Sequence, residues 1–163
     1  MLIFIIKVKR MERINVYVMI GLPGAGKDTW IRNNLPDCKC IACRDDIRVE
    51  LGLCGQDEKF AGTPEQENLV TGIFNTKLRG YAELGQDIVI NNTNLKRRYR
   101  MQYKSLLKHF PVKWIYVIVT APSIEDNISR RQGQIPPEII RRMSDSYEPP
   151  TPDEYDEIIE VKQ

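Results

Sequence analysis

The segment Gly21-Leu-Pro-Gly-Ala-Gly26-Lys27-Asp28-Thr29 decides the fold of this chain. It follows an apolar run at residues 14–20 and opens a stretch of helical character that Pro36 stops. Glycines at this spacing let successive backbone N–H groups point at one anion, and the N-terminus of a following helix adds partial positive charge. The segment therefore predicts a phosphate-binding loop in which Lys27 meets the β- and γ-phosphates of a nucleotide. We assign nucleotide binding to Gly21, Pro23, Gly24, Ala25, Gly26, Lys27, Asp28 and Thr29.

Apolar strands alternate with helical stretches over the rest of the chain. Strands are predicted at residues 14–20, 38–43, 87–91, 112–120 and, as a last edge strand, 158–161. Helices are predicted at residues 27–35, from near 46, and at 63–84, 95–110, 123–132 and 137–147. The third of these begins with a capping box, Thr63 with Gln66, and has Pro64 in its first turn. The alternation predicts a three-layer α/β fold with a mainly parallel sheet.

Composition bounds the class of protein. The chain has 163 residues, of which 42% are apolar and 28% charged, which is typical of one soluble globular domain and excludes wholesale disorder. No apolar run approaches the roughly 18 residues of a membrane span, so we expect no membrane partner. We expect a single domain over residues 11–163. Residues 1–10 are either an N-terminal extension before a start at Met11 or an added strand.

The four cysteines allow two interpretations. Cys38, Cys40 and Cys43, with Cys54 following, have a spacing that could hold zinc. The same residues also fit a short strand, in which cysteines behave as small buried hydrophobes, and we favour that interpretation. Without a secretory signal, the thiols are expected to be reduced in a cytoplasmic setting.

A second constellation, Arg44-Asp-Asp-Ile-Arg48, follows the second strand. In open α/β sheets ligands bind beyond the carboxyl ends of the strands, so Asp45 is expected at the rim of the phosphate site. There a carboxylate could accept a proton from an attacking hydroxyl, and Arg48 could bind a substrate phosphate. The alternative is that Asp45 or Asp46 only caps the helix.

Two further groups complete the candidate site. Asn91-Asn92-Thr93-Asn94 ends the third strand, where many phosphate-loop NTPases carry an acid, and we place Thr93 in the substrate-binding set. Arg130 and Arg131 end a helix and could close over the nucleotide to stabilise charge during phosphoryl transfer. The alternatives are ordinary loop residues and helix-end arginines that interact with the macrodipole.

Mg²⁺ is the expected cofactor beside ATP, and its ligands are unusual here. The position after the loop lysine is commonly Ser or Thr, whose hydroxyl binds the metal, but this chain has Asp28 there and Thr29 one residue later. A carboxylate oxygen can serve Mg²⁺ directly or through water. We therefore expect Asp28 and Thr29 at the metal, with the alternative that the ion stays hydrated and Asp28 only faces it.

These segments resemble, in the same order, the T-even phage type of polynucleotide 5′-kinase and the related small phosphate-loop kinases of the AAA type. The resemblance covers about residues 14–161 and includes Arg130-Arg131 with the Pro-Pro-Glu-Ile-Ile140 that follows. It implies an adenylate-kinase-like sheet of five parallel strands in the order 2-3-1-4-5. It also implies transfer of the γ-phosphate of ATP to the 5′-hydroxyl of DNA or RNA. In this resemblance Lys27 holds phosphates, Asp45 is the general base, Arg48 contacts the phosphate next to the acceptor sugar, and Arg130 or Arg131 is the lid arginine.

The chain departs from the family pattern twice, at Asp28 and at Asn92, which replaces the Asp of Asp-Thr-Asn. One acid appears and another disappears, so we hypothesise a swap that keeps the charge of the metal site. The resemblance leaves no room for the phosphatase domain of the phage enzyme.

The nature of the acceptor is less constrained than the fold. Seven basic residues with no acid among them lie in residues 96–113 and could attract a nucleic-acid backbone, or could form a solvated helix face. The alternative functions are a kinase of a nucleoside, sugar or other small metabolite, and a nucleotide-binding switch, which the missing third-strand acid favours. The sequence contains no heptad that would demand an oligomer.

Overall fold

The computed structural model describes residues 13–54 and 62–163. Its strands are β1 Ile14–Ile20, β2 Cys40–Ala42, β3 Ile88–Ile90, β4 Val112–Thr120 and β5 Glu157–Lys162. Its helices are α1 Lys27–Asn34, α2 Arg44–Glu50, α3 Pro64–Glu83, α4 Arg97–Leu106, α5 Ile124–Arg130 and α6 Pro137–Asp145. Residues 1–10 and Met11, for which an extension or an added strand is expected, lie outside the described part of the chain.

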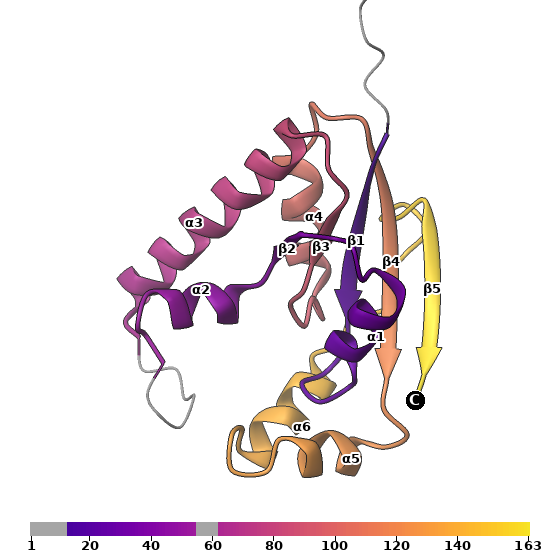
Figure 1. Ribbon diagram of the computed structural model, residues 1–163. Coiled ribbons are helices and arrows are strands. Elements are labelled where there is room, and N and C mark those ends of the chain that lie inside the picture. Colours follow the sequence, from indigo (N-terminus) through magenta and orange to yellow (C-terminus); the bar gives the residue numbers. More distant parts are fainter. Residues whose placement is uncertain (1–12, 55–61) are drawn as a thin grey trace, which may run out of the picture.

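The strands form one parallel sheet in the order β2-β3-β1-β4-β5. This order confirms the prediction. β1 lies in the centre, with Val16 opposite Ile88 of β3 on one side and Trp114 of β4 on the other. Since all strands run the same way, their carboxyl ends meet at one edge, where the loop after β1 and helices α5 and α6 gather (Figure 1).

Helices cover both faces of the sheet. Figure 1 shows α1 on one side and α3 and α4 on the other. Alternate residues of β1 serve the two cores: Val16 and Val18 pack with Phe74 of α3, whereas Met19 packs with Ile31 of α1. Burial of these aliphatic and aromatic side chains is the main stabilisation of the three layers.

Local signals explain where the helices begin. Thr63 and Gln66 form the predicted capping box of α3: the Thr63 side chain accepts from the Gln66 N–H, and the Gln66 side chain accepts from the Thr63 N–H. α2 begins earlier than predicted, at Arg44 rather than near Asp46, with Cys43 at the N-cap. Asp45 and Asp46 therefore lie in its first turn, and neither is the cap. Carboxylates there interact favourably with the helix macrodipole.

The other differences are at element ends. β2 covers three residues rather than the predicted 38–43, because the chain before Cys40 does not pair with β3. α4 covers Arg97–Leu106 rather than residues 95–110, since Lys96 is still extended and Leu107 has left the helix. No helix within the described ranges is long and apolar enough to cross a bilayer.

The cysteines pack as parts of the fold. All four are free thiols; Cys40 and Cys43 are buried, and the Cys38 thiol donates to the Asp87 carbonyl at 3.4 Å. Burial raises the pKa of Cys43 to about 11, which keeps it as an unreactive thiol. Within residues 13–54 and 62–163, no group of three or more His, Cys, Asp and Glu side chains is placed to hold a metal.

Two buried tyrosines give a matched test of the core. The Tyr103 hydroxyl donates to Asn94 Oδ1 at 2.8 Å, whereas the Tyr116 hydroxyl is buried with no hydrogen-bond partner among the described residues. We expect Tyr103→Phe to lower the free energy of unfolding by about 1–3 kcal/mol, because it leaves the buried Asn94 Oδ1 without the hydrogen bond from the tyrosine hydroxyl. Tyr116→Phe should leave it unchanged or raise it by about 1 kcal/mol. Urea unfolding followed by tryptophan fluorescence measures both; equal losses in the two variants would contradict the assignment.

Candidate active site

The loop between β1 and α1 is shaped by close backbone approach. A Cβ on Gly21 would lie 2.4 Å from the Val119 carbonyl oxygen of β4, so only glycine fits there. Gly26, directly before α1, has φ +99°, which a side chain would oppose. The chain therefore turns sharply from the central strand into α1, with the first N–H groups of the helix free to face a ligand.

Lys27 folds back over this loop. Its Nζ donates to the carbonyls of Gly21 and Leu22, both at 2.9 Å. Burial lowers the pKa of Lys27 to about 8, with the positive charge of Arg131 adding to the effect and Asp28 opposing it. The ammonium group thus lies among loop carbonyls in a poorly solvated position, where an added anion would be strongly favoured.

A cavity of about 390 Å³ opens beside the loop and brings together most of the predicted nucleotide-binding residues. Arg130 and Arg131 both reach it: Arg130 Nη1 donates to the Gly24 carbonyl at 3.0 Å, and Arg131 bonds Gln134. The cavity is lined by Gly24, Gly26, Lys27, Asp28, Thr29, Arg32, Arg130, Arg131 and Gln163.

Asp28 contacts the end of β3, but through Asn91 rather than Asn92. Asn91 Nδ2 donates to Asp28 Oδ1 at 2.7 Å. Asn92 is engaged elsewhere, because its Oδ1 accepts from the Arg44 N–H at 3.0 Å and its Nδ2 lies 3.4 Å from the Tyr103 hydroxyl. The neighbour of Asp28 is therefore Asn91, and the hypothesised exchange of charge between Asp28 and Asn92 stays a prediction.

Thr93 meets the phosphate loop through its backbone. Its carbonyl accepts from the Gly21 N–H at 3.1 Å, and its side chain is half-buried. Thr29, the second predicted metal ligand, lines the cavity, and its hydroxyl lies 3.5 Å from Arg32 Nη2. Asp28 and Thr29, at successive positions of α1, both line this cavity, and their assignment as metal ligands stays a prediction.

The α2 constellation forms an ion network that includes a residue the sequence interpretation missed. Arg48 donates to both oxygens of Glu67 on α3, at 2.7 and 3.0 Å, and also pairs with Asp45. Arg44 reaches the same Glu67 at 3.0 Å and the Thr71 hydroxyl at 2.8 Å. Arg44 and Arg48 are four residues apart and so share a helix face, which is the signal that could have predicted an acidic partner on a neighbouring helix.

Negative charge gathers between the phosphate loop and α2. The Asp45 side chain is 85% exposed at the rim. Burial raises the pKa of Asp46 above its usual range, and repulsion from Asp45 and Asp28 adds to the effect. Asp45 and Asp28 therefore both act on the pKa of Asp46, and the same two carboxylates oppose the lowering of the Lys27 pKa.

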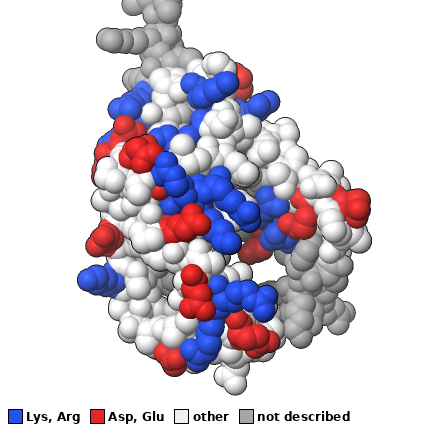
Figure 2. Space-filling view, turned by 180° about the vertical axis from the view of Figure 1, so that it is seen from behind, with Lys and Arg blue, Asp and Glu red and all other residues white. Residues whose placement is uncertain are grey.

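Three of the seven basic residues in the stretch at residues 96–113 form ion pairs within the fold, and the two interpretations of the stretch, a nucleic-acid contact and a solvated helix face, stay predictions. Arg97 pairs with Asp153, Arg100 with Glu154 and Lys113 with Glu157. Lys104 donates to the carbonyls of Asp153 and Glu154, both at 3.0 Å. Figure 2 accordingly shows acidic side chains beside the basic ones on the face turned away from Figure 1.

A comparison with protein families agrees with this geometry. The AAA domain model matches residues 16–150, from the middle of β1 to the segment after α6. The chain belongs to the AAA domain family. Together with the parallel sheet in the order 2-3-1-4-5, this makes the fold that of the P-loop NTPase kinases.

Solved structures similar to this AAA domain include kinases of different substrate classes. A proposed kinase from Chloroflexus aurantiacus is 16% identical with a TM-score of 0.69, over 93% of this chain and 86% of that one. A sugar kinase from Janibacter is 20% identical with a TM-score of 0.59, over the same shares. The Pnkp1/Rnl/Hen1 RNA repair complex is 16% identical with a TM-score of 0.66; the match spans 85% of this chain but only 45% of that one. At these identities the likeness establishes the fold alone.

The Glu67 network predicts a pH dependence of stability. Hydrogen bonds from Arg48, opposed by burial and supported by Arg44, lower the pKa of Glu67 to about 2. A depressed carboxyl pKa stabilises the fold above the ordinary value of 4.5, and this stabilisation is lost as the pH falls toward 2. We expect Glu67→Gln to lower the free energy of unfolding by about 2 kcal/mol at pH 6, and by less at pH 3.

Urea unfolding at pH 6 and pH 3 measures this difference. Glu65→Gln is the matched control, because Glu65 lies in the same first turn of α3 but is exposed. A Glu67→Gln deficit that stays constant between the two pH values, or that Glu65→Gln reproduces, would contradict the network.

Proposed function

We propose that the chain is a cytoplasmic ATP-dependent kinase that transfers the γ-phosphate to the 5′-hydroxyl of DNA or RNA, like the T-even phage type of polynucleotide 5′-kinase. The observation that carries this proposal is that one loop, after β3, contacts both the phosphate loop that precedes Lys27 and the helix α2 that carries Asp45 and Arg48. The end of β3 connects them: Asn91 touches Asp28, Thr93 touches Gly21, and Asn92 touches the start of α2.

Each residue has a role that its position supports. Lys27 and the loop N–H groups would hold the β- and γ-phosphates. The acceptor oxygen attacks the γ-phosphorus, the bond to the β–γ bridging oxygen breaks, and Asp45 accepts the hydroxyl proton. Arg130 and Arg131, which line the same cavity, stabilise the charge that spreads over the phosphoryl oxygens.

Arg48 connects substrate binding to the base. It pairs with Asp45, so Asp45 is engaged in the absence of substrate. A phosphate next to the acceptor sugar would compete for the same guanidinium and leave Asp45 available for the hydroxyl. On this proposal an acceptor with a neighbouring phosphate would be favoured over one without it, and Thr93 would be a further substrate-binding residue.

The residues present fit Mg²⁺. Asp28 is an exposed carboxylate on the cavity wall, with Thr29 beside it, and hard oxygen ligands are those that Mg²⁺ prefers. When bound, the ion would neutralise phosphate charge. Asn91 would then orient the Asp28 carboxylate by the hydrogen bond that it already makes.

A second candidate, a kinase of a small metabolite, is favoured by the neutralised surface of α4. Arg97 and Arg100 pair with acids of the segment before β5, which reduces the positive field that would attract a long nucleic acid. The same loop and base would serve a nucleoside or sugar hydroxyl. At the site itself, the two candidates differ in whether Arg48 binds a phosphate next to the acceptor hydroxyl.

The experiment that tests the proposal measures transfer of labelled γ-phosphate from ATP. Acceptors are a 5′-hydroxyl oligonucleotide, a nucleoside 3′-phosphate, the matching nucleoside, and a panel of sugars. We expect label on the first two, at least about 100-fold less with Asp45→Asn, and none with Lys27→Ala. Label on nucleosides or sugars alone would establish the second candidate. ATP binding without transfer to any acceptor would favour a nucleotide-binding switch.

The contact between Asp28 and Asn91 gives a separate prediction about the metal site. Asp28→Ser should lower kcat by about tenfold or more, because it removes the carboxylate. Adding Asn91→Asp should restore part of that loss, since it returns a carboxylate to the same place. A double-mutant cycle on kcat at saturating Mg²⁺ measures the coupling. Asn92→Asp is the matched control, and rescue by Asn92→Asp instead would sink this assignment.

A further inference from the structure

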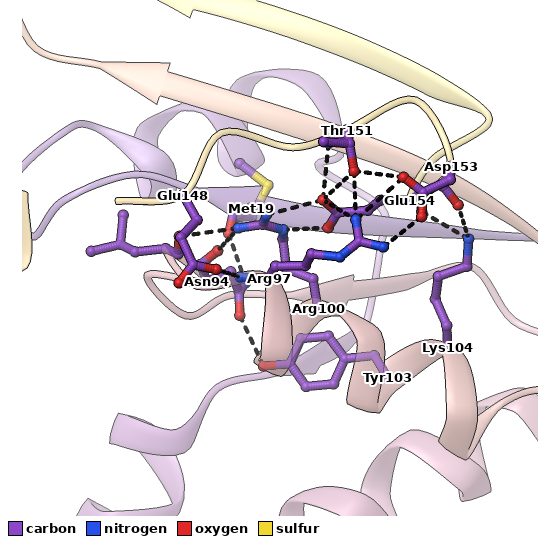
Figure 3. Close-up of polar contacts among 11 residues, drawn as sticks. Met19, Asn94, Arg97, Arg100, Tyr103, Lys104, Glu148, Thr151, Asp153 and Glu154 are labelled. Atoms are coloured by element: carbon purple, nitrogen blue, oxygen red, sulfur yellow. Dashed lines mark hydrogen bonds and ion pairs between the residues drawn. The ribbon is translucent and has the colours of Figure 1, made fainter. Parts of the chain in front are cut away.

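The segment between α6 and β5 carries a carboxylate into the interior. Glu154 and Arg100 of α4 are both completely buried and form a two-pronged ion pair, Nε to Oε2 at 2.7 Å and Nη2 to Oε1 at 3.2 Å (Figure 3). The remaining Arg100 nitrogen, Nη1, donates to the carbonyls of Asn94 and Leu95 at 3.0 and 3.1 Å. Glu154 thus orients the Arg100 guanidinium, whose Nη1 binds the backbone of the loop after β3.

Asn94 in that loop needs such support. Its φ is +49°, a left-handed conformation that asparagine adopts more readily than most residues with a side chain but less readily than glycine. Its Nδ2 donates to the Met19 carbonyl of β1 at 2.7 Å, and its Oδ1 accepts from the Tyr103 hydroxyl. Strained backbone of this kind persists where the surrounding contacts over-determine it.

The loop that Asn94 anchors makes one contact with each part of the candidate site. Thr93 accepts from the Gly21 N–H of the phosphate loop, Asn91 donates to Asp28, and Asn92 caps the Arg44 N–H at the start of α2. The loop at residues 91–94 therefore sets where the phosphate loop lies relative to Asp45.

We propose that Glu154 is a positioning residue for the candidate site: through Arg100 it holds residues 91–94 in the conformation that binds the phosphate loop and α2. The effect of Glu154 on turnover rests on the proposed phosphoryl transfer, but its effect on the conformation of residues 91–94 does not. This role requires an arginine, because one edge of the Arg100 guanidinium donates to both oxygens of the Glu154 carboxylate while Nη1 donates to two backbone carbonyls.

The test is amide hydrogen exchange by NMR on the full chain, with Glu154→Gln against Asp153→Asn. Both changes neutralise one acid of the same segment, but Asp153 pairs with Arg97, which also lies 3.0 Å from Glu154 Oε1, so Asp153→Asn alters the surface side of this network and leaves the Arg100–Glu154 pair in place. We compare the exchange rates of two amides. The Gly21 amide donates to the Thr93 carbonyl, and the Ala25 amide donates to the Leu22 carbonyl within the phosphate loop. Glu154→Gln should speed Gly21 exchange at least about tenfold relative to Ala25, and Asp153→Asn should leave the ratio unchanged.

Arg100→Lys is the second variant, used alone if Glu154→Gln does not fold. It keeps a buried cation for Glu154 but cannot also reach both carbonyls, so it should speed Gly21 exchange in the same way. Equal acceleration of Gly21 and Ala25, or none at Gly21, would overturn the proposal, because the pair would then act on global stability only.

Turnover separates this proposal from the proposed function. With a working acceptor, kcat of Glu154→Gln should fall about tenfold while KM for ATP stays near that of the unaltered protein, since the loop groups that hold the nucleotide remain. Selective exchange at Gly21 in a chain that phosphorylates no acceptor would uphold the positioning role and reject the kinase reaction.

Discussion

The hydrogen bond between the Asn94 amide and the Met19 carbonyl lies where the two central strands, β1 and β3, come to their ends. A buried amide leaves little freedom, since every polar group around it must be satisfied. The fixed position of this hydrogen bond also restricts the backbone of the residues next to it in the chain. Gly21 follows β1 by one residue, and Asn91 to Thr93 lie between β3 and Asn94. The positions of the phosphate loop and of the first turn of α2 therefore both depend on the hydrogen bond between Asn94 and Met19.

The support for this point comes from a distant part of the sequence. Arg100 and Glu154 are separated by more than fifty residues, and their burial is unfavourable unless each satisfies the other. A buried ion pair adds little net stability compared with apolar residues of the same size, but it accepts only one geometry. In this chain the geometry so specified is that of the loop at residues 91–94, which touches both halves of the candidate site.

The architecture could be predicted from the sequence because its signals are local or periodic. The glycine loop between an apolar strand and a helix, the Thr63–Gln66 capping box and the strands at residues 14–20 and 112–120 all lie where predicted. The site was harder, since its decisive contacts join residues far apart. Nothing near Glu67 indicates that it binds Arg44 and Arg48, and choosing Asn91 over Asn92 as the partner of Asp28 needs the exact twist of the chain after β3. The basic stretch at residues 96–113 was visible in the sequence, but its pairing with Asp153, Glu154 and Glu157 was not.

That pairing changes how the surface would respond to its ionic surroundings. Free cationic patches gather mobile anions, and releasing them is a large part of what drives polyanions onto proteins. Here the carboxylates of Asp153 and Glu154 already accompany Arg97 and Arg100, so few mobile anions remain to be released. The affinity of this face for a polyanion would therefore depend less on ionic strength than the affinity of an unpaired basic patch of the same size.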